Sequence, residues 1–156
     1  MNIQPKTLRL YALVMLPVAI AAAWFVFRYE KQPVTVPIAQ GSVAVTVGGR
    51  TFSAEIADTP ASRELGLGER DSLCANCAML FRFDQPGKYG FWMKGMRFPL
   101  DLAWIRDGRT VFIEKNIQAD STEIMTPDTA TIEVLETNAG ALADVKIGDE
   151  VVLSGH

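Results

Sequence analysis

Histidine is almost missing from this chain of 156 residues, and the single one, His156, is the last residue. A Ser-His-Asp or Cys-His nucleophile system needs a histidine as its base. Metal sites of the multi-histidine kind need several such side chains. The sequence therefore excludes these classes of chemistry for lack of the residues that perform them.

Positive charge is also scarce, with 15 lysines and arginines against 18 aspartates and glutamates. Two of the bases, Lys6 and Arg9, lie in residues 1–27, which contain no acid, so the remainder of the chain is distinctly acidic. A nucleic-acid binder needs a basic surface to meet the phosphate backbone. We therefore expect no nucleic-acid partner.

One segment near the N-terminus has no charge at all. Residues 10–27 are apolar throughout and have about the length that spans the hydrocarbon core of a bilayer. The bases before this segment predict that residues 1–9 are cytoplasmic and that the rest of the chain faces the periplasm or the exterior. The sequence thus predicts a single-pass protein of the cytoplasmic membrane, with the membrane as a partner through residues 10–27.

A cleaved signal peptide is the alternative for the same segment. Ala21 and Ala23 form an A-x-A cleavage site, and cleavage near Ala23 would release a secreted domain. The apolar run continues from Trp24 to Phe27, whereas a signal peptide normally turns polar after its cleavage site, and this favours an uncleaved anchor. Both alternatives export the domain.

Beyond the apolar segment, residues 28–41 hold two prolines and no regular periodicity, which is typical of a linker. Residues 42–156 then form the domain. Its strongest local pattern is a hairpin with strands at 43–47 and 50–57, because the two-residue turn Gly48-Gly49 between them suits a tight β-turn.

Short elements with frequent turns make up the rest of the domain. Asp58 or Thr59 before Pro60 predicts the start of a short helix that ends at Gly66, and a second short helix is expected over 140–145. Further strands are expected at 79–83, 88–93, 98–105, 110–117, 129–137 and 150–153. No long helix is available for parallel crossovers, so the fold class is mainly β: a small antiparallel sandwich or barrel with two short helices, preceded by one transmembrane helix.

Several segments occur in an order and spacing that resemble a known family. They are RELGL, AMLFRFDQPG, FWMKGMRFPLDLAWI, a following Asp-Gly turn, TIEVLETNAG and VKIGDEV. Over residues 45–153 the sequence resembles domain of unknown function family 192, with departures at Ala78, at Gly95 and in its two cysteines. The resemblance implies a small, jelly-roll-like β-domain without an established activity, often found behind a signal or anchor.

Cysteine occurs only twice, at Cys74 and Cys77. In an oxidising compartment such a pair is expected to form a disulfide. A thioredoxin-like redox centre needs the first cysteine at a helix N-terminus, whereas here a strand follows directly. A zinc site would need two more ligands from another chain. We therefore expect a local disulfide.

The hairpins around Asp101 allow an argument about sheet faces. A tight turn at Asp107-Gly108 pairs Asp101 with Glu114, and a short loop before Pro99 pairs Trp92 with Asp101 and places Lys94 on the diagonal. The opposite face, which we expect to be core, carries Phe91, Met93, Leu100, Leu102, Trp104, Val111 and Ile113.

Three hypotheses fit this polar cluster of Trp92, Lys94, Asp101 and Glu114. The first is an ion-pair network that fixes strand register, with Arg63 as an additional cation. The second is a shallow binding site for a small polar or carbohydrate-like molecule. The third is a glycosidase-like hydrolase that uses Asp101 with Glu114 or Glu136.

Two remaining features bear on the site. Glu136 shares strand parity with apolar neighbours, so it is expected to point inward and to pair with a cation such as Arg63. Copper could bind methionine side chains, and the candidates are Met79, Met93, Met96 and Met125. Methionines in apolar strands usually belong to the core, so we expect neither a metal nor a cofactor.

The sequence therefore favours a membrane-tethered extracytoplasmic β-domain that binds a small polar or carbohydrate-like ligand, or an envelope protein, without performing chemistry. The candidate ligand-binding residues are Trp92, Lys94, Asp101, Glu114, Arg63 and Glu136. The alternatives are a carboxylate-dependent hydrolase and a purely structural interaction module.

Overall fold

The structure is a computed structural model that describes residues 41–155. Within this range, no helix is long and apolar enough to cross a membrane. The predicted anchor at residues 10–27, and nearly all of the linker, lie outside the described residues. The anchor therefore stays a prediction.

The first hairpin forms as predicted. β1 (Ser42–Val47) pairs antiparallel with β2 (Arg50–Ala57), and Val47 lies opposite Arg50 across the turn. Gly48 and Gly49 have φ values of 57° and 74°, the left-handed conformation that this tight turn requires at both central positions. Glycine adopts it without steric cost, which is why the sequence predicts this turn well.

The helix α2 (Pro60–Leu65) also begins and ends where the sequence indicates. Thr59 accepts a hydrogen bond from the Ser62 amide, and the Ser62 side chain accepts one from the Thr59 amide, so the two residues form a capping box. Pro60 occupies the first turn, and Gly66 ends the helix at a φ of 53°. Local capping chemistry thus determines the boundaries of this element.

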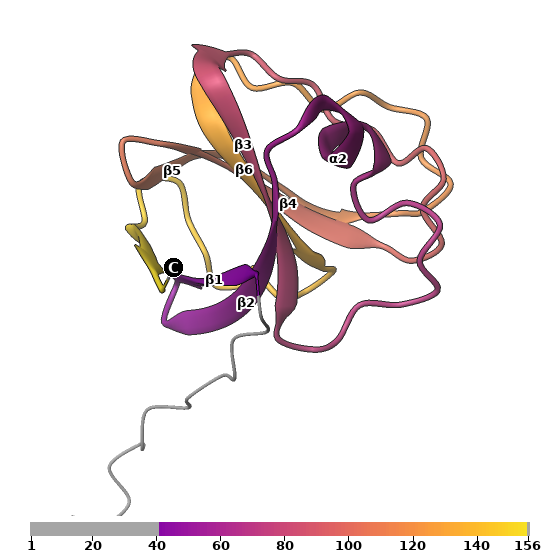
Figure 1. Cartoon of the computed structure of the whole chain (residues 1–156), viewed down its shortest axis with the longest axis horizontal. Helices are drawn as coiled ribbons and strands as arrows, with labels where there is room; N and C mark the ends of the chain where they lie inside the picture. Colours follow the sequence, from indigo (N-terminus) through magenta and orange to yellow (C-terminus); the bar gives the residue numbers. More distant parts are fainter. Residues whose placement is uncertain (1–40, 156) are drawn as a thin grey trace, which may run out of the picture. The chain divides into compact units, whose positions relative to one another are not determined.

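Five further strands complete one sheet. They are β3 (Cys77–Gly87), β4 (Leu100–Arg106), β5 (Arg109–Ile117), β6 (Thr131–Asn138) and β7 (Val151–Ser154), and the strand order is β5-β4-β6-β3-β2-β1-β7. β2 and β3 are parallel, which corrects the prediction of a purely antiparallel sheet. The segment from Asp58 to Asn76, which includes α2, is long enough to carry the chain back to the end of the sheet at which β2 begins, and so allows parallel pairing (Figure 1).

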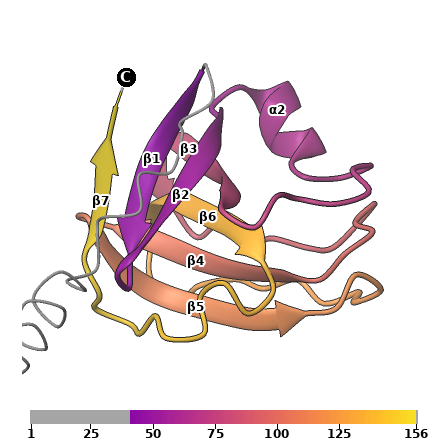
Figure 2. The same ribbon diagram turned by 90° about the horizontal axis from the view of Figure 1, so that it is seen from below.

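The sheet curls into a half-barrel. Figure 2 shows β1, β2 and β7 running across the direction of β4 and β5. An antiparallel bridge joins Arg109 to Glu150, and the Val151 amide donates to the Gly108 carbonyl at 2.8 Å, so the two edges of the sheet meet at one end. In place of the expected sandwich or barrel, the structure has a single sheet curled into a half-barrel.

Two predicted elements do not form. Residues 88–93 make only the isolated bridge between Phe91 and Met125, and the Tyr89 carbonyl accepts a hydrogen bond from the Trp104 side chain. Residues 140–145 form successive turns, and the Leu142 amide donates to the Asp101 side chain rather than to a helical carbonyl. Of the two expected helices, only α2 is present in residues 41–155.

Both faces of the central strands are buried. Alternate residues of β3 contribute to two apolar clusters, Leu80 to one and Phe81 to the other. The predicted core face around β4 is confirmed except for Ile113, which packs against the cluster that contains Leu80. The second cluster lies on the side of the sheet where α2 and residues 91–98 also pack.

The disulfide between Cys74 and Cys77 is confirmed, with 5.0 Å between the two Cα atoms. It lies at the entrance to β3, where the Asn138 side chain donates to the Leu73 and Cys74 carbonyls. The disulfide therefore holds one loop at the end of the sheet.

We expect this disulfide to contribute little to global stability. Replacing both cysteines by serine is expected to lower the free energy of unfolding by about 2 kcal/mol or less, because a four-residue ring removes little entropy from the unfolded chain. Urea unfolding of the oxidised protein and of the double variant measures the difference. A loss of half the total stability would contradict a merely local role.

Candidate functional site

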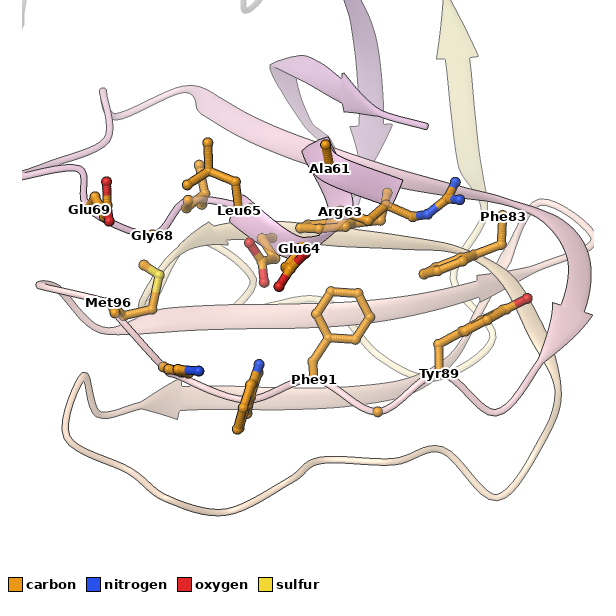
Figure 3. Close-up of a pocket in the computed structure, with 18 residues that line it drawn as sticks. Ala61, Arg63, Glu64, Leu65, Gly68, Glu69, Phe83, Tyr89, Phe91 and Met96 are labelled. Carbon is orange, nitrogen blue, oxygen red and sulfur yellow. The ribbon is translucent and has the colours of Figure 1, made fainter. Parts of the chain in front are cut away.

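A cleft opens beside α2, between the chain that follows this helix and the segment from Tyr89 to Met96. Its volume is about 650 Å³, and Figure 3 shows Phe91 projecting toward α2 while Met96 lies toward one end and Tyr89 toward the other. The lining residues are Ala61, Arg63, Glu64, Leu65, Gly66, Leu67, Gly68, Glu69, Phe81, Phe83, Tyr89, Gly90, Phe91, Trp92, Lys94, Gly95, Met96 and Glu136.

Glu136 is the buried carboxyl of this cleft. It lies on β6 opposite Met79 of β3 and Leu102 of β4, and its exposed fraction is only 6%. Within residues 41–155 its Oε2 atom has no hydrogen-bond partner, and burial raises the pKa of the carboxyl from 4.5 to about 8. At neutral pH the group is therefore mostly a neutral acid that can donate a proton or a hydrogen bond.

Aromatic side chains form much of the wall. The Phe81 and Phe91 rings meet edge to face at 4.8 Å between centroids, while Phe83 and Tyr89 stack at 3.5 Å. Trp104 packs edge to face on Phe91, and its indole donates to the Tyr89 carbonyl at 2.9 Å. This packing fixes an irregular segment that has almost no backbone pairing of its own.

Two cationic side chains lie over aromatic rings that line the cleft. The Arg63 guanidinium lies 5.2 Å from the centroid of Phe83, and Nη1 also donates to the Asp58 and Arg82 carbonyls. The Lys94 ammonium lies 5.0 Å from the centroid of Trp92, and in the described part of the chain it makes no hydrogen bond or ion pair. Lys94 is thus the cation available to a ligand.

Four of the six candidate residues come together here: Arg63, Trp92, Lys94 and Glu136. The expected ion pair between Glu136 and Arg63 is wrong, because Arg63 uses its Nη1 group to bind two backbone carbonyls. Glu136 is inward-facing, as predicted, but within residues 41–155 it forms no ion pair.

Asp101 does not belong to the cleft. It is fully buried on β4, where Oδ1 accepts a hydrogen bond from the Asn116 amide at 2.7 Å and Oδ2 accepts one from the Leu142 amide at 2.9 Å. Both carboxylate oxygens are therefore bound to backbone. Asp101 holds the turns after β6 against the sheet instead of facing a ligand.

The predicted acid pair of Asp101 and Glu114 is also wrong. Glu114 lies opposite Leu102, because β5 contains irregularities that shift its register against β4. One lies around Val111, and the other leaves the Asn116 amide free to bind Asp101. Glu114 is not among the residues that line the cleft.

The aromatic partners of the site were not identified from the sequence. Phe81, Phe83 and Tyr89 look like ordinary strand residues, and they converge only because β3 and the segment after it fold beside α2. The run KYGFWM contains a weak signal, since four aromatic or basic residues surround one glycine. No spacing rule connects that run to Glu136.

The structure provides no basis for a metal centre in the part of the chain that it describes: no group of three or more His, Cys, Asp or Glu side chains there is placed to hold an ion. The methionines considered as copper ligands pack in the apolar cluster with Phe81; they are Met79, Met93, Met96 and Met125.

The curled sheet, the capped helix and the cleft together define a small β-domain with one buried acid under aromatic rings. The family model DUF192, described as an uncharacterized ACR, matches residues 43–153, and the chain belongs to this family. No curated protein matches the chain.

Two solved structures are similar to the chain, each with a TM-score of 0.68. One is a protein of unknown function from Novosphingobium aromaticivorans DSM 12444, 30% identical, covering 79% of this chain and 94% of that one. The other is a proposed transcription regulator from Sinorhizobium meliloti 1021, 32% identical, covering 76% of this chain and 96% of that one. The segments RELGL, FWMK and VLE, through which the sequence resembles the family, all contribute residues to the cleft.

Proposed function

We propose that this chain is a membrane-tethered extracytoplasmic domain that binds a small polar or carbohydrate-like ligand in the cleft beside α2. The observation that carries the proposal is the Glu136 carboxyl, which is buried beneath aromatic rings and lacks a partner for Oε2 among the described residues. Burying a polar group without a hydrogen bond costs stability. A ligand that bonds to this carboxyl would recover that cost.

The walls suit the same class of ligand. Aromatic rings pack against the apolar faces of a sugar-like molecule, while a few polar groups fix its orientation. Trp92 is 55% exposed at the mouth, beside the available ammonium of Lys94. Rings, one acid and one cation within a single cleft therefore support selective binding of a small polar molecule.

The other two hypotheses receive less support. A glycosidase-like mechanism needs a second carboxyl across the groove. The acids predicted for that role, Asp101 and Glu114, do not line the cleft, and the two other carboxyls that do, Glu64 and Glu69, are exposed. A purely structural module gains nothing from an unpaired buried carboxyl, because such a group destabilises the fold. Of the three hypotheses, ligand binding is the one that provides a partner for the buried Glu136 carboxyl.

Binding should depend on the two residues at the mouth. We expect Trp92→Ala and Lys94→Ala to lower retention of polar metabolites from a cell-envelope extract by about tenfold, because each removes about 1 to 2 kcal/mol of contact. Mass spectrometry of the molecules retained by immobilised full-length protein measures this. The matched control is Lys88→Ala, an exposed lysine outside the cleft. If all three variants fold and retain the same amount of each molecule, the proposal that the cleft binds the ligand is wrong.

The tether makes a separate prediction. Full-length protein should sediment with membranes and stay there in about 1 M salt, because an apolar span does not depend on surface charge. A variant that lacks residues 10–27 should remain in the soluble fraction of the cell. Recovery of a mature chain that begins at Trp24 would show cleavage instead.

A further inference from the structure

We infer that the ligand carries a protonated amino group, held between the Glu136 carboxylate and the rings of Phe81 and Phe91. This inference rests on the proposed function, because it concerns the same cleft and names the chemical class of its occupant: a small hydroxylated amine. Three features of the cleft support it.

The first feature is the surroundings of the carboxyl. β3 and β4 present the apolar Met79 and Leu102 directly opposite Glu136, and neither strand offers it a cation. A buried carboxylate is stable only when it is paired and hydrogen-bonded. An ammonium supplies both the opposite charge and the N–H donors that Oε2 lacks. A neutral hydroxyl would supply only the hydrogen bond.

The second feature is the position of the rings. An ideal Cβ built on Gly66 would lie 3.3 Å from Cζ of Phe81 and 3.9 Å from Oε2 of Glu136, so the ring and the carboxyl border the same space. Phe91 meets Phe81 edge to face beside this space. The distance given by the glycine is to the rim of the Phe81 ring, and a cation in this space would be bound favourably where it meets a ring face, more strongly where water is excluded. The glycine keeps that space open.

The chain's own cations support this interpretation of the rings. Arg63 lies over Phe83, and Lys94 lies over Trp92, so two of the aromatic rings of the cleft already bind a cation. Among the described residues, no cation lies over Phe81 or Phe91, the pair closest to Gly66 and Glu136. A ligand ammonium would occupy the corresponding position there.

The third feature is the charge balance around the cleft. Arg63 and Glu64 of α2, Glu69 after the helix and Lys94 of the facing segment are the other charged groups that line it. These four cancel, so an ionised Glu136 leaves one net negative charge for a cation to neutralise. The chain as a whole has a net charge of −3, which also favours the approach of cations.

Calorimetry with two matched probes tests the inference on the full-length protein in detergent. N-methylglucamine and sorbitol are both polyols, and they differ chiefly in the ammonium group of the former. At about pH 8.5 we expect N-methylglucamine to bind about tenfold more tightly than sorbitol. At about pH 6 its affinity should be roughly 50- to 100-fold lower than at pH 8.5, because a proton competes for a carboxyl with a pKa of about 8. Near pH 7 its binding should release close to one proton.

Variants identify the site of the effect. Glu136→Gln should bind the two polyols equally, and Phe91→Leu should weaken N-methylglucamine about fivefold with little effect on sorbitol. The wild-type comparison of probes and pH stands even where a variant fails to fold.

The possible failures separate the two proposals. Sorbitol binding as tightly as N-methylglucamine, with an affinity that falls above pH 8, overturns the amine and leaves the proposed function standing. If neither probe binds at about 10 mM, the inference of an amine ligand is wrong. The proposed function is decided separately, by whether wild-type protein retains more polar molecules than Trp92→Ala.

Discussion

Asp101→Asn is expected to lower the free energy of unfolding by about 2 to 4 kcal/mol. The buried carboxylate accepts one backbone hydrogen bond on each oxygen, from Asn116 and from Leu142. An asparagine keeps one acceptor and turns an amide donor toward the other N–H, which is then buried without a partner. Because small domains are stable by about 5 to 15 kcal/mol, this loss is a large share of the total.

The expected loss reflects what Asp101 holds in place. Lys115 donates to the Ala143 and Val145 carbonyls, so Asp101 and Lys115 together bind the turns between β6 and β7 to the sheet. Urea unfolding measures the change, and Asp149→Asn is the matched control, because its carboxylate accepts the Lys146 amide near the surface and no other hydrogen bond from the described residues. We expect less than about 1 kcal/mol for the control. Equal losses of stability in both variants would contradict the role of Asp101 in holding these turns against the sheet.

Glu136 should make the protein less stable as the pH rises. Its pKa is 4.5 in an exposed setting and about 8 in the folded protein, where burial disfavours the charged form. Below pH 4.5 both the folded and unfolded states hold the proton, and the stability that the neutral Glu136 carboxyl contributes is fully present. Between pH 4.5 and 8 only the folded state holds it, so stability falls by roughly 1 kcal/mol per pH unit.

Glu136→Gln removes this dependence. The variant should match the wild type near pH 4.5 and exceed it by roughly 3 to 5 kcal/mol at pH 9, because glutamine has no proton to lose. Urea unfolding at one-unit pH intervals measures both profiles. Glu64→Gln is the control, since Glu64 lines the same cleft but is exposed. Parallel profiles for the wild type and Glu136→Gln would show that the carboxyl titrates normally in the fold.

Features that depend on neighbouring residues could be predicted from the sequence. The Gly48-Gly49 hairpin, the helix between Thr59 and Gly66 and the disulfide of Cys74 and Cys77 all follow from chemistry within a few positions. The strand parity of β6 likewise predicted that Glu136 is buried, although Ile132, which shares this parity, is 38% exposed and residues 134–137 are all buried. Turn geometry, capping and side-chain period act locally, so a single sequence indicates them, although the strand expected at 88–93 and the helix expected at 140–145 did not form.

Features that depend on pairing between distant segments were decided only by the tertiary structure. Irregularities in β5 moved Glu114 away from Asp101, and the crossover that contains α2 made β2 and β3 parallel. The cleft brings α2, β3, β6 and the irregular segment around Phe91 around one carboxyl. A register shift of one residue changes which side chains face each other, and nothing local signals it. The sequence therefore indicated four of the residues that line the cleft, Arg63, Trp92, Lys94 and Glu136, whereas the packing of the curled sheet determined which aromatic rings surround them and excluded Asp101 and Glu114.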